Sequence, residues 1–367
     1  GLTDPIGATP VAPLGDLFVA TPLGPGAVGL GISVPYAAVL AYPDDGPQRF
    51  ALQRTSLLVG QLSLGAAVAT GPLAVGATVD AVLGSGSLAR VQDFAGLEFF
   101  SDVVGDPPLS QPNDFGRAAP SSVREQDVLG RDIALRGLAV HATFGVGMAL
   151  DLGRSRLAAS YAHGSPVVFR GRFALDLDDP VFTNDLVPFG LQYPPQAEGD
   201  SAFSVATPRR LRLGLATALD DEHQLRLTLT GSDWTRYDAT EIELVSPELA
   251  QPSLGLSDTV TARVPRRWQP TLGVEAALRL RRSLVAVGYA SPASPDDTVD
   301  VASIDGHRLV LRGGGELSLS DTATLWVGGK VQGLLPRTVT TSGHDLANGR
   351  YDLVLASLST HLTLARR

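Results

Sequence analysis

Two features of this chain could in principle do chemistry: a glycine-rich stretch near its start and six scattered histidines. Residues 24–29 fit the G-x-G-x-x-G spacing of a dinucleotide-binding turn, and Asp44 follows about twenty residues later. That site requires a helix to open at the turn, because the helix N-terminus receives the pyrophosphate. Here Leu30 to Pro35 continue as an alternating, strand-like run. The sequence therefore predicts neither a dinucleotide nor any other cofactor.

The histidines form no metal-binding or catalytic pattern. No two of them frame a glutamate in an H-E-x-x-H motif, and the chain has no cysteine to supply a thiolate. No G-x-S-x-G nucleophile elbow is present. We therefore expect no metal site and no enzyme, and we keep a catalytic set dispersed over several strands as a minor alternative. The histidines are His141, His163, His223, His307, His344 and His361.

Composition excludes further classes of protein. The formal net charge is −9, so the chain lacks the basic stripe of a nucleic-acid binder. Hydrophobic residues make up 44% of the chain, yet they form no uninterrupted run of about eighteen, which excludes transmembrane helices. The chain begins at Gly1 without a signal peptide, and we expect a mature or trimmed product.

Apolar residues instead alternate with small or polar ones in long runs. From Leu138 to Leu150 every second residue is apolar, while the residues between include His141, Thr143 and glycines. Successive strand side chains point to opposite faces, so each run predicts a strand with one apolar face. The predicted strands lie near 13–21, 25–42, 49–69, 72–90, 132–152, 156–176, 200–219, 223–244, 258–281, 284–303, 306–320, 323–341 and 350–365.

The connections between these strands are of two kinds. Tight polar turns (153–155, 220–222, 281–283 and 320–322) contrast with long connections at 91–130 and 176–200. Most runs reach the ~9–11 residues that a tilted strand needs to cross a bilayer, and short turns opposite long loops are typical of outer-membrane barrels.

The sequence therefore predicts an all-β fold, a single transmembrane antiparallel β-barrel over residues 1–367. About thirteen strands are visible. Bacterial single-chain barrels carry an even number, so we expect about fourteen, with one miscounted or upstream of Gly1. A soluble β-sandwich is the alternative, although its strands are usually shorter.

The two long connections carry more apolar residues than a water-facing loop needs. Exposed apolar patches of this size usually mark binding surfaces. One interpretation is that the two loops pack on each other as a cap, and the other is a groove that captures an apolar ligand; the two are compatible. The candidate binding residues are Phe94, Leu97, Phe99, Phe100, Phe182, Leu186, Phe189 and Tyr193.

A proline interrupts the second predicted strand. Pro35 has no N–H for the ladder, so inside a sheet it indicates a bulge, an edge or a break. We expect Pro35 and Tyr36 to mark a local kink or gap in the barrel wall. The alternative is that Pro35 lies beyond the membrane, where the strand ends.

Several segments resemble the FadL family, which includes aromatic-hydrocarbon channels of the TodX type. Asp233-Trp234 resembles the family's S-D-W step at a strand end. Residues 288–295, with Gly288-Tyr289 and two Ser-Pro steps, and residues 305–308 resemble its G-x-x-Y/F-D-x-S-P-V-P … P-D-x-D-R segment. The likeness covers about residues 11–367 and is clearest after residue 200. The family's N-terminal plug, with its Asn-Pro-Ala signature, is absent from this sequence.

The resemblance implies a passive uptake channel for hydrophobic small molecules such as long-chain fatty acids, related lipids or hydrocarbons. The outer loops would capture the molecule, and a gap in the wall would release it sideways into the bilayer. The expected partners are outer-membrane lipids and the hydrophobic substrate, with no nucleic acid, and the expected form is a monomer in the outer membrane of a Gram-negative-type bacterium.

Two other functions stay open. A polar-solute porin would be favoured if inward-facing arginines line a wet pore, and the candidates are Arg212, Arg226, Arg279 and Arg312. A non-transporting structural barrel of an envelope assembly would be favoured by a plugged, unopened wall.

Overall fold

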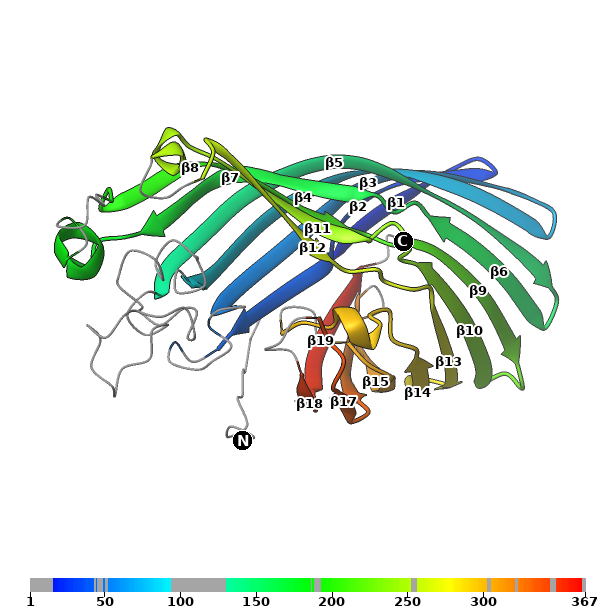
Figure 1. Ribbon diagram of the computed structural model, residues 1–367. Helices are drawn as coiled ribbons and strands as arrows, with labels where there is room; N and C mark the ends of the chain where they lie inside the picture. Colours follow the sequence, from blue (N-terminus) through cyan, green and yellow to red (C-terminus); the bar gives the residue numbers. More distant parts are fainter. Residues whose placement is uncertain are drawn as a thin grey trace.

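Most of the described chain is antiparallel β-sheet. The computed structural model describes residues 16–42, 44, 49, 52–93, 130–185, 187, 193–251, 256–301, 305–320, 323–343 and 348–364. Seventeen strands form one curved sheet (Figure 1), and β17 and β18 pair only with each other in a second, two-stranded sheet.

The seventeen strands make thirteen passes along the wall within the described residues. Nine passes are single strands: β1 (Leu17–Leu23), β2 (Gly26–Ala41), β3 (Arg54–Thr70), β4 (Leu73–Asp93), β5 (Gly130–Leu152), β14 (Ser283–Ala290), β15 (Arg308–Ser320), β16 (Ala323–Leu334) and β19 (Val354–Leu364). Four passes consist of two strands each: β6 (Ser155–Ala162) with β7 (Pro166–Asp176), β9 (Arg209–Ala218) with β8 (Gln196–Ala206), β10 (His223–Asp233) with β11 (Ala239–Val245), and β13 (Thr271–Leu280) with β12 (Thr259–Pro265).

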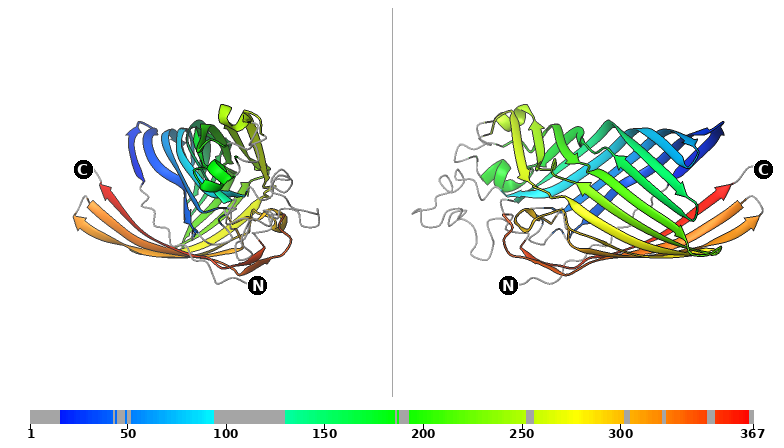
Figure 2. Two further views of the ribbon diagram at one scale, coloured as in Figure 1. Left: turned by 60° about the vertical axis from the view of Figure 1, so that its left-hand side comes forward. Right: turned by 90° about the vertical axis from the view of Figure 1, so that its right-hand side faces the viewer.

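Each pass pairs with the next from β1 round to β19, and the resulting wall curls into a barrel (Figure 2). Within the described residues no ladder joins β19 to β1. Passes alternate in direction, so the first and the thirteenth run parallel, and one further pass between them would give every strand antiparallel neighbours. The prediction of an antiparallel, outer-membrane-type β-barrel is confirmed, and the thirteen described passes match the thirteen strands visible in the sequence.

The predicted strands were too long in several places. Each of the four runs at 156–176, 200–219, 223–244 and 258–281 is interrupted and gives two strands. The run at 284–303 ends at Ala290, and that at 323–341 ends at Leu334. Prolines explain three of these six breaks, because Pro208, Pro292 and Pro336 have no N–H to continue a ladder.

The tight turns lie at one end of the barrel, here called the short-turn end, and the long connections lie at the loop end. Glycines with positive φ form three of the tight turns: Gly24 (57°), Gly71 (55°) and Gly153 (72°). Gly24 thus belongs to the β1–β2 turn, and the residues after it form β2 rather than a helix. The G-x-G-x-x-G spacing thus belongs to a hairpin turn followed by a strand, and not to a turn that opens a helix.

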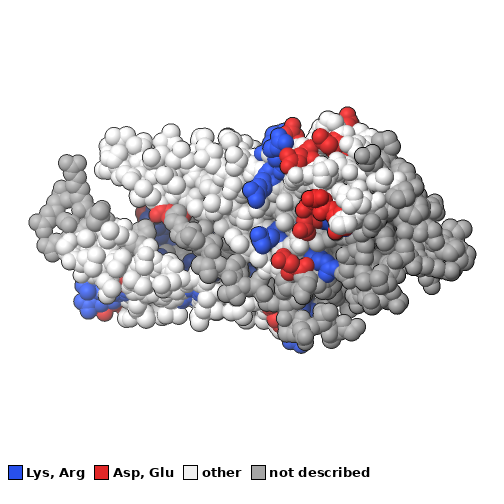
Figure 3. Space-filling model, turned by 90° about the vertical axis from the view of Figure 1, so that its left-hand side faces the viewer, with Lys and Arg blue, Asp and Glu red and all other residues white. Residues whose placement is uncertain are grey.

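The outer face of the wall is apolar. Outward side chains such as Leu138, Val140 and Leu358 are 70–80% exposed, and similar residues occupy the outward positions of every pass. In Figure 3 acidic and basic side chains gather in a band right of centre and in a smaller group at the lower left, and the broad white face between them carries few charges. This distribution fits a wall that faces lipid. None of the described helices is both long and apolar enough to cross a membrane.

Two clusters of buried apolar side chains fill parts of the fold. The first, the loop-end cluster, joins the ends of β5, β7 and β8 to the π-helix η3 (Val181–Asp185) and the 3₁₀-helix η5 (Pro247–Ala250). The second lies inside the wall between β3–β5 and β7, around Val59, Val82 and Phe169. A further 3₁₀-helix, η6 (Asp296–Thr298), and the β17 (Arg337–Val339) to β18 (Gly349–Tyr351) hairpin complete the described elements.

Candidate functional site

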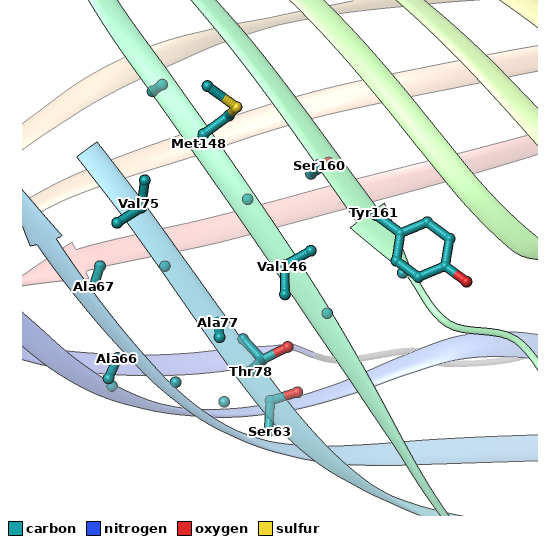
Figure 4. Close-up of a pocket in the computed structure, with 18 of the residues that line it drawn as sticks. Ser63, Ala66, Ala67, Val75, Ala77, Thr78, Val146, Met148, Ser160 and Tyr161 are labelled. Atoms are coloured by element: carbon teal, nitrogen blue, oxygen red, sulfur yellow. The ribbon is translucent and has the colours of Figure 1, made fainter. Parts of the chain in front are cut away.

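A cavity of about 840 Å³ lies inside the wall toward the short-turn end. Residues of β1–β6, β9 and β10 line it, and most of them are glycine, alanine or other small apolar residues. Figure 4 shows Ala67 of β3, Ala77 of β4 and Ser160 of β6 around this space. Small side chains on this side of the barrel leave room for an apolar molecule.

Three polar residues stand where this cavity meets a smaller one. The smaller cavity measures about 90 Å³, and Gln61, Asp80 and Arg210 line both. Asp80 is only 4% exposed, and its Oδ1 atom has no hydrogen-bond partner among the described residues. Its Oδ2 atom accepts a hydrogen bond from Thr78 Oγ1 at 3.3 Å. Buried polar atoms almost always have a hydrogen-bond partner in folded proteins, and ionisable residues inside a membrane protein are usually functional. Asp80 is therefore a candidate functional residue.

The opposite wall carries charged side chains in pairs. Arg279 Nη2 donates to Glu316 Oε1 at 3.0 Å, and Arg312 forms an ion pair with Glu275. Arg226 donates to Gln224 Oε1 at 2.7 Å. These residues face inward as the alternation predicted, but the pairing neutralises part of the basic charge that a polar pore would use.

The β2 strand has a bulge at Pro35, as the sequence indicated. Ser33 pairs with Gln61 and Tyr36 pairs with Val59, so β2 carries one extra residue between them. The extra residue exchanges the two faces of the strand, and Tyr36 therefore turns inward. Its hydroxyl accepts a hydrogen bond from Arg210 Nη2 at 3.3 Å. Pro35 thus lies within the strand, not beyond its end.

The bulge also coincides with the end of a ladder. The pairing of β1 with β2 stops at Leu17 and Ile32. Beyond Ile32, the edge of β2 that faces β1 has no strand partner within the described residues. Whether Pro35 and Tyr36 form a lateral opening stays a prediction.

Two of the eight predicted binding residues lie in the loop-end cluster. Phe182 is 0% exposed and Tyr193 is 4% exposed, and their rings meet edge to face with centroids 5.2 Å apart. Both side chains are packed in a core instead of facing a groove. The remaining six, Phe94, Leu97, Phe99, Phe100, Leu186 and Phe189, lie outside the described residues.

Burial of Tyr193 has a measurable consequence in alkaline solution. Desolvation raises the pKa of its phenol from the ordinary value of 10.0 to about 12. The folded loop end therefore favours the neutral phenol, and this stabilisation is complete below pH 10 and is lost as the pH rises through about 12. A phenolate absorbance titration of the wild type minus that of Tyr193→Phe should show a single midpoint near 12; a midpoint near 10 would contradict the burial of this ring.

The sequence did not single out Asp80, Gln61 or Arg210. Each occupies an ordinary inward position of an alternating strand, where polar residues are common. Asp80 did carry a signal, since it is the only acidic residue between Leu73 and Gln92. His141 was predicted to face inward, and it does, with its Nε2 atom hydrogen-bonded to Ser165 Oγ. The side chain of His361 is outside the described residues.

The described chain is a β-barrel with an interior cavity, and solved structures share this fold. A comparison with family models finds no match, and neither does a comparison with curated proteins. A Pseudomonas aeruginosa FadL homologue is 15% identical with a TM-score of 0.69, covering 95% of this chain and 76% of that one. The Ralstonia pickettii toluene transporter TbuX is 14% identical with a TM-score of 0.62, covering 96% and 81%. The Pseudomonas putida toluene transporter TodX is 13% identical with a TM-score of 0.61, covering 95% and 81%.

The chain therefore has the FadL-type fold, as the sequence motifs predicted. Two of these three solved structures, TbuX and TodX, are toluene transporters by name.

Proposed function

We infer that this chain is a passive uptake channel for hydrophobic small molecules, such as fatty acids, related lipids or hydrocarbons. The observation that carries the proposal is the cavity of about 840 Å³, lined mainly by small apolar residues inside a barrel with an apolar outer face. An alkyl chain gains about 0.8 kcal/mol for each CH₂ kept out of water, so a dry interior followed by a sideways exit is a favourable route. The toluene transporters with the same fold support this substrate class.

The same proposal locates the chain as a monomer in the outer membrane of a Gram-negative-type bacterium. An apolar outer face of this extent requires lipid around it, and closed or nearly closed sheets are the form in which strands cross a bilayer. Lipids of that membrane are then the neighbours of residues such as Leu138 and Leu358.

Capture at the loop end and release at the β2 bulge complete the proposed route. The apolar residues of 94–100 and 186–189 would form the capture surface, while Phe182 and Tyr193 would support it from within the loop-end cluster. From there the cargo would enter the interior and leave where the wall is bulged at Pro35 and Tyr36.

A polar-solute porin is the second candidate, because inward arginines do line one wall. The ion pairs of Arg279 with Glu316 and of Arg312 with Glu275 weaken the case for a porin. Conductance separates the two functions: a porin gives steady ion current in a planar bilayer, and a hydrophobic-cargo channel gives little.

Uptake of labelled long-chain fatty acid and of toluene tests the proposal in cells that lack their own channel. We expect the wild-type chain to raise the initial rate for at least one of them. The double variant Phe99→Asp/Phe189→Asp should abolish that gain, because two carboxylates in the capture surface must be desolvated before apolar cargo can bind. Leu335→Asp, at an exposed position outside both long connections, is the matched control and should keep the rate.

No uptake of either compound by a chain shown to be folded in the membrane would overturn the proposal. Equal loss in the control would show that the aspartates act on folding and not on capture.

A further inference from the structure

The barrel wall is interrupted a second time, between β5 and the pass made of β6 and β7. The ladder between β5 and β6 ends at Gly145 and Ala162, and the ladder between β5 and β7 begins at Leu138 and Arg170. Residues 139–144 therefore face residues 163–169 without a ladder. One backbone hydrogen bond, from His163 N to Phe144 O at 2.9 Å, spans this stretch.

Side chains take the place of the missing ladder. Thr143 Oγ1 donates to the carbonyl oxygen of His163 at 2.6 Å, and His141 is hydrogen-bonded to Ser165. On the other edge, Ser165 N donates to Thr207 Oγ1 at 3.1 Å, and that hydroxyl donates to Ser165 O at 3.0 Å. Backbone groups in a bilayer must find partners within the protein, so these polar side chains make an unladdered wall tolerable.

Close packing fixes the interruption in place. A Cβ atom on Gly164 would lie 2.2 Å from the carbonyl carbon of Pro208, so only glycine fits there. Residues 163–165 are thereby drawn onto the β8–β9 pass and away from β5. On the outer face, Val140 is left 80% exposed, one of the most exposed apolar side chains of the described wall.

The cavity of about 90 Å³ lies at this interruption, and both faces of the wall contribute to it. Asp80, His141 and Thr143 line it from inside. Phe144 and His163 line it from the outer face, where their rings stack with centroids 4.9 Å apart. The cavity therefore borders residues of both faces at the point where the ladder is missing. Its inner rim is shared with the large apolar cavity at Asp80 and Gln61.

We propose that the interruption between β5 and β6–β7 is a second side opening, through which narrow apolar cargo passes between the barrel interior and the surrounding lipid. The inference rests on the proposed function. At about 30 Å³ for each water, the cavity holds about three waters, which suits an unbranched alkyl chain or one aromatic ring and excludes a bulky fused-ring molecule. This opening is separate from the bulge at Pro35, although Pro35 lines the same small cavity.

A reversible disulfide across the interruption, here called the staple, tests the proposal. The chain has no cysteine of its own, so only the two introduced cysteines can pair. Val140 and Val168 both face outward on opposite sides of the interruption. In Val140→Cys/Val168→Cys, oxidation should lower the initial uptake rate at least fivefold, and reduction should restore it. The control pair Val287→Cys/Leu311→Cys joins two outward residues of β14 and β15 that are already ladder partners, away from both cavities, and should leave the rate unchanged in both states.

If the disulfide does not form, a second variant provides the test. Ala142→Trp places a bulky ring on the outer face of the unladdered stretch and should lower uptake of alkyl cargo by a similar factor. Leu64→Trp, on the outer face of β3 where both neighbouring strands are laddered, is its control. Unchanged uptake in a formed staple, or unchanged uptake in Ala142→Trp where none forms, would overturn this opening and leave the bulge as the route. Absence of uptake by the wild type would instead overturn the proposed function itself.

Discussion

Replacing Gly171 with alanine is expected to destabilise the barrel severely. Gly171 of β7 lies opposite Gly137 of β5, and a Cβ atom added to it would lie 1.9 Å from the backbone oxygen of Arg136. Backbone atoms of a neighbouring strand move only if the strand itself moves. Overpacking that side chains can absorb costs about 1–3 kcal/mol, so a backbone clash should lower the free energy of unfolding by about 3 kcal/mol or more.

The urea midpoint of the purified barrel in lipid vesicles measures this loss, together with the heat-dependent shift in gel mobility that folded barrels show. Gly231→Ala is the matched control, because a Cβ atom at Gly231 of β10 meets nothing within 4 Å. We expect its midpoint to stay close to that of the wild type. A Gly171→Ala protein with the wild-type midpoint would show that β5 and β7 are not packed as closely as described.

The wall of the barrel could be predicted from sequence because it depends on a local pattern. Lipid outside and small residues inside impose a period of two on every pass, and that period is visible in a run such as Leu138 to Leu150. The breaks within passes depend on distant contacts instead. Residues 163–165 leave β5 because Gly164 packs on Pro208, which lies more than forty residues later. No alternation of residue types reveals that contact.

The candidate site divides in the same way. The bulge at Pro35 could be predicted from sequence, because proline has no N–H to donate to a neighbouring strand. The small cavity beside it could not be foreseen, because Asp80, His141 and Tyr36 come from three different strands. Tyr36 faces inward only because the bulge exchanges the two faces of β2. Composition showed that the connection at 176–200 was unusually apolar, but it did not show that Phe182 and Tyr193 point into a core.

Phe182→Ala should unfold the loop end while leaving the membrane wall intact. The ring of Phe182 is fully buried against Tyr193, and the guanidinium carbon of Arg131 lies 4.5 Å from the ring centroid. Removing a buried phenylalanine typically costs about 3–5 kcal/mol. The loop-end cluster lies beyond the ladders of β6, β9 and β10, so the cost should fall on local opening and not on the whole barrel.

Protease added to intact cells distinguishes local from global unfolding. We expect Phe182→Ala to be cut within the 176–200 connection at least tenfold faster than the wild type, with an unchanged urea midpoint for the barrel. Val187→Ala removes an exposed side chain from the same connection and should be cut at the wild-type rate. Cleavage of Phe182→Ala at the wild-type rate would contradict a packing role.

Uptake by the conservative variant Phe182→Leu then separates support from direct binding. Leucine keeps most of the buried apolar volume, so it should preserve both protease resistance and uptake if Phe182 acts by packing. If Phe182 instead contacts cargo through its ring, Phe182→Leu should lose uptake of toluene while its loop end remains resistant. Because the ring is 0% exposed, we expect the first result. Phe182 then supports the loop end by packing in the loop-end cluster and does not itself bind cargo.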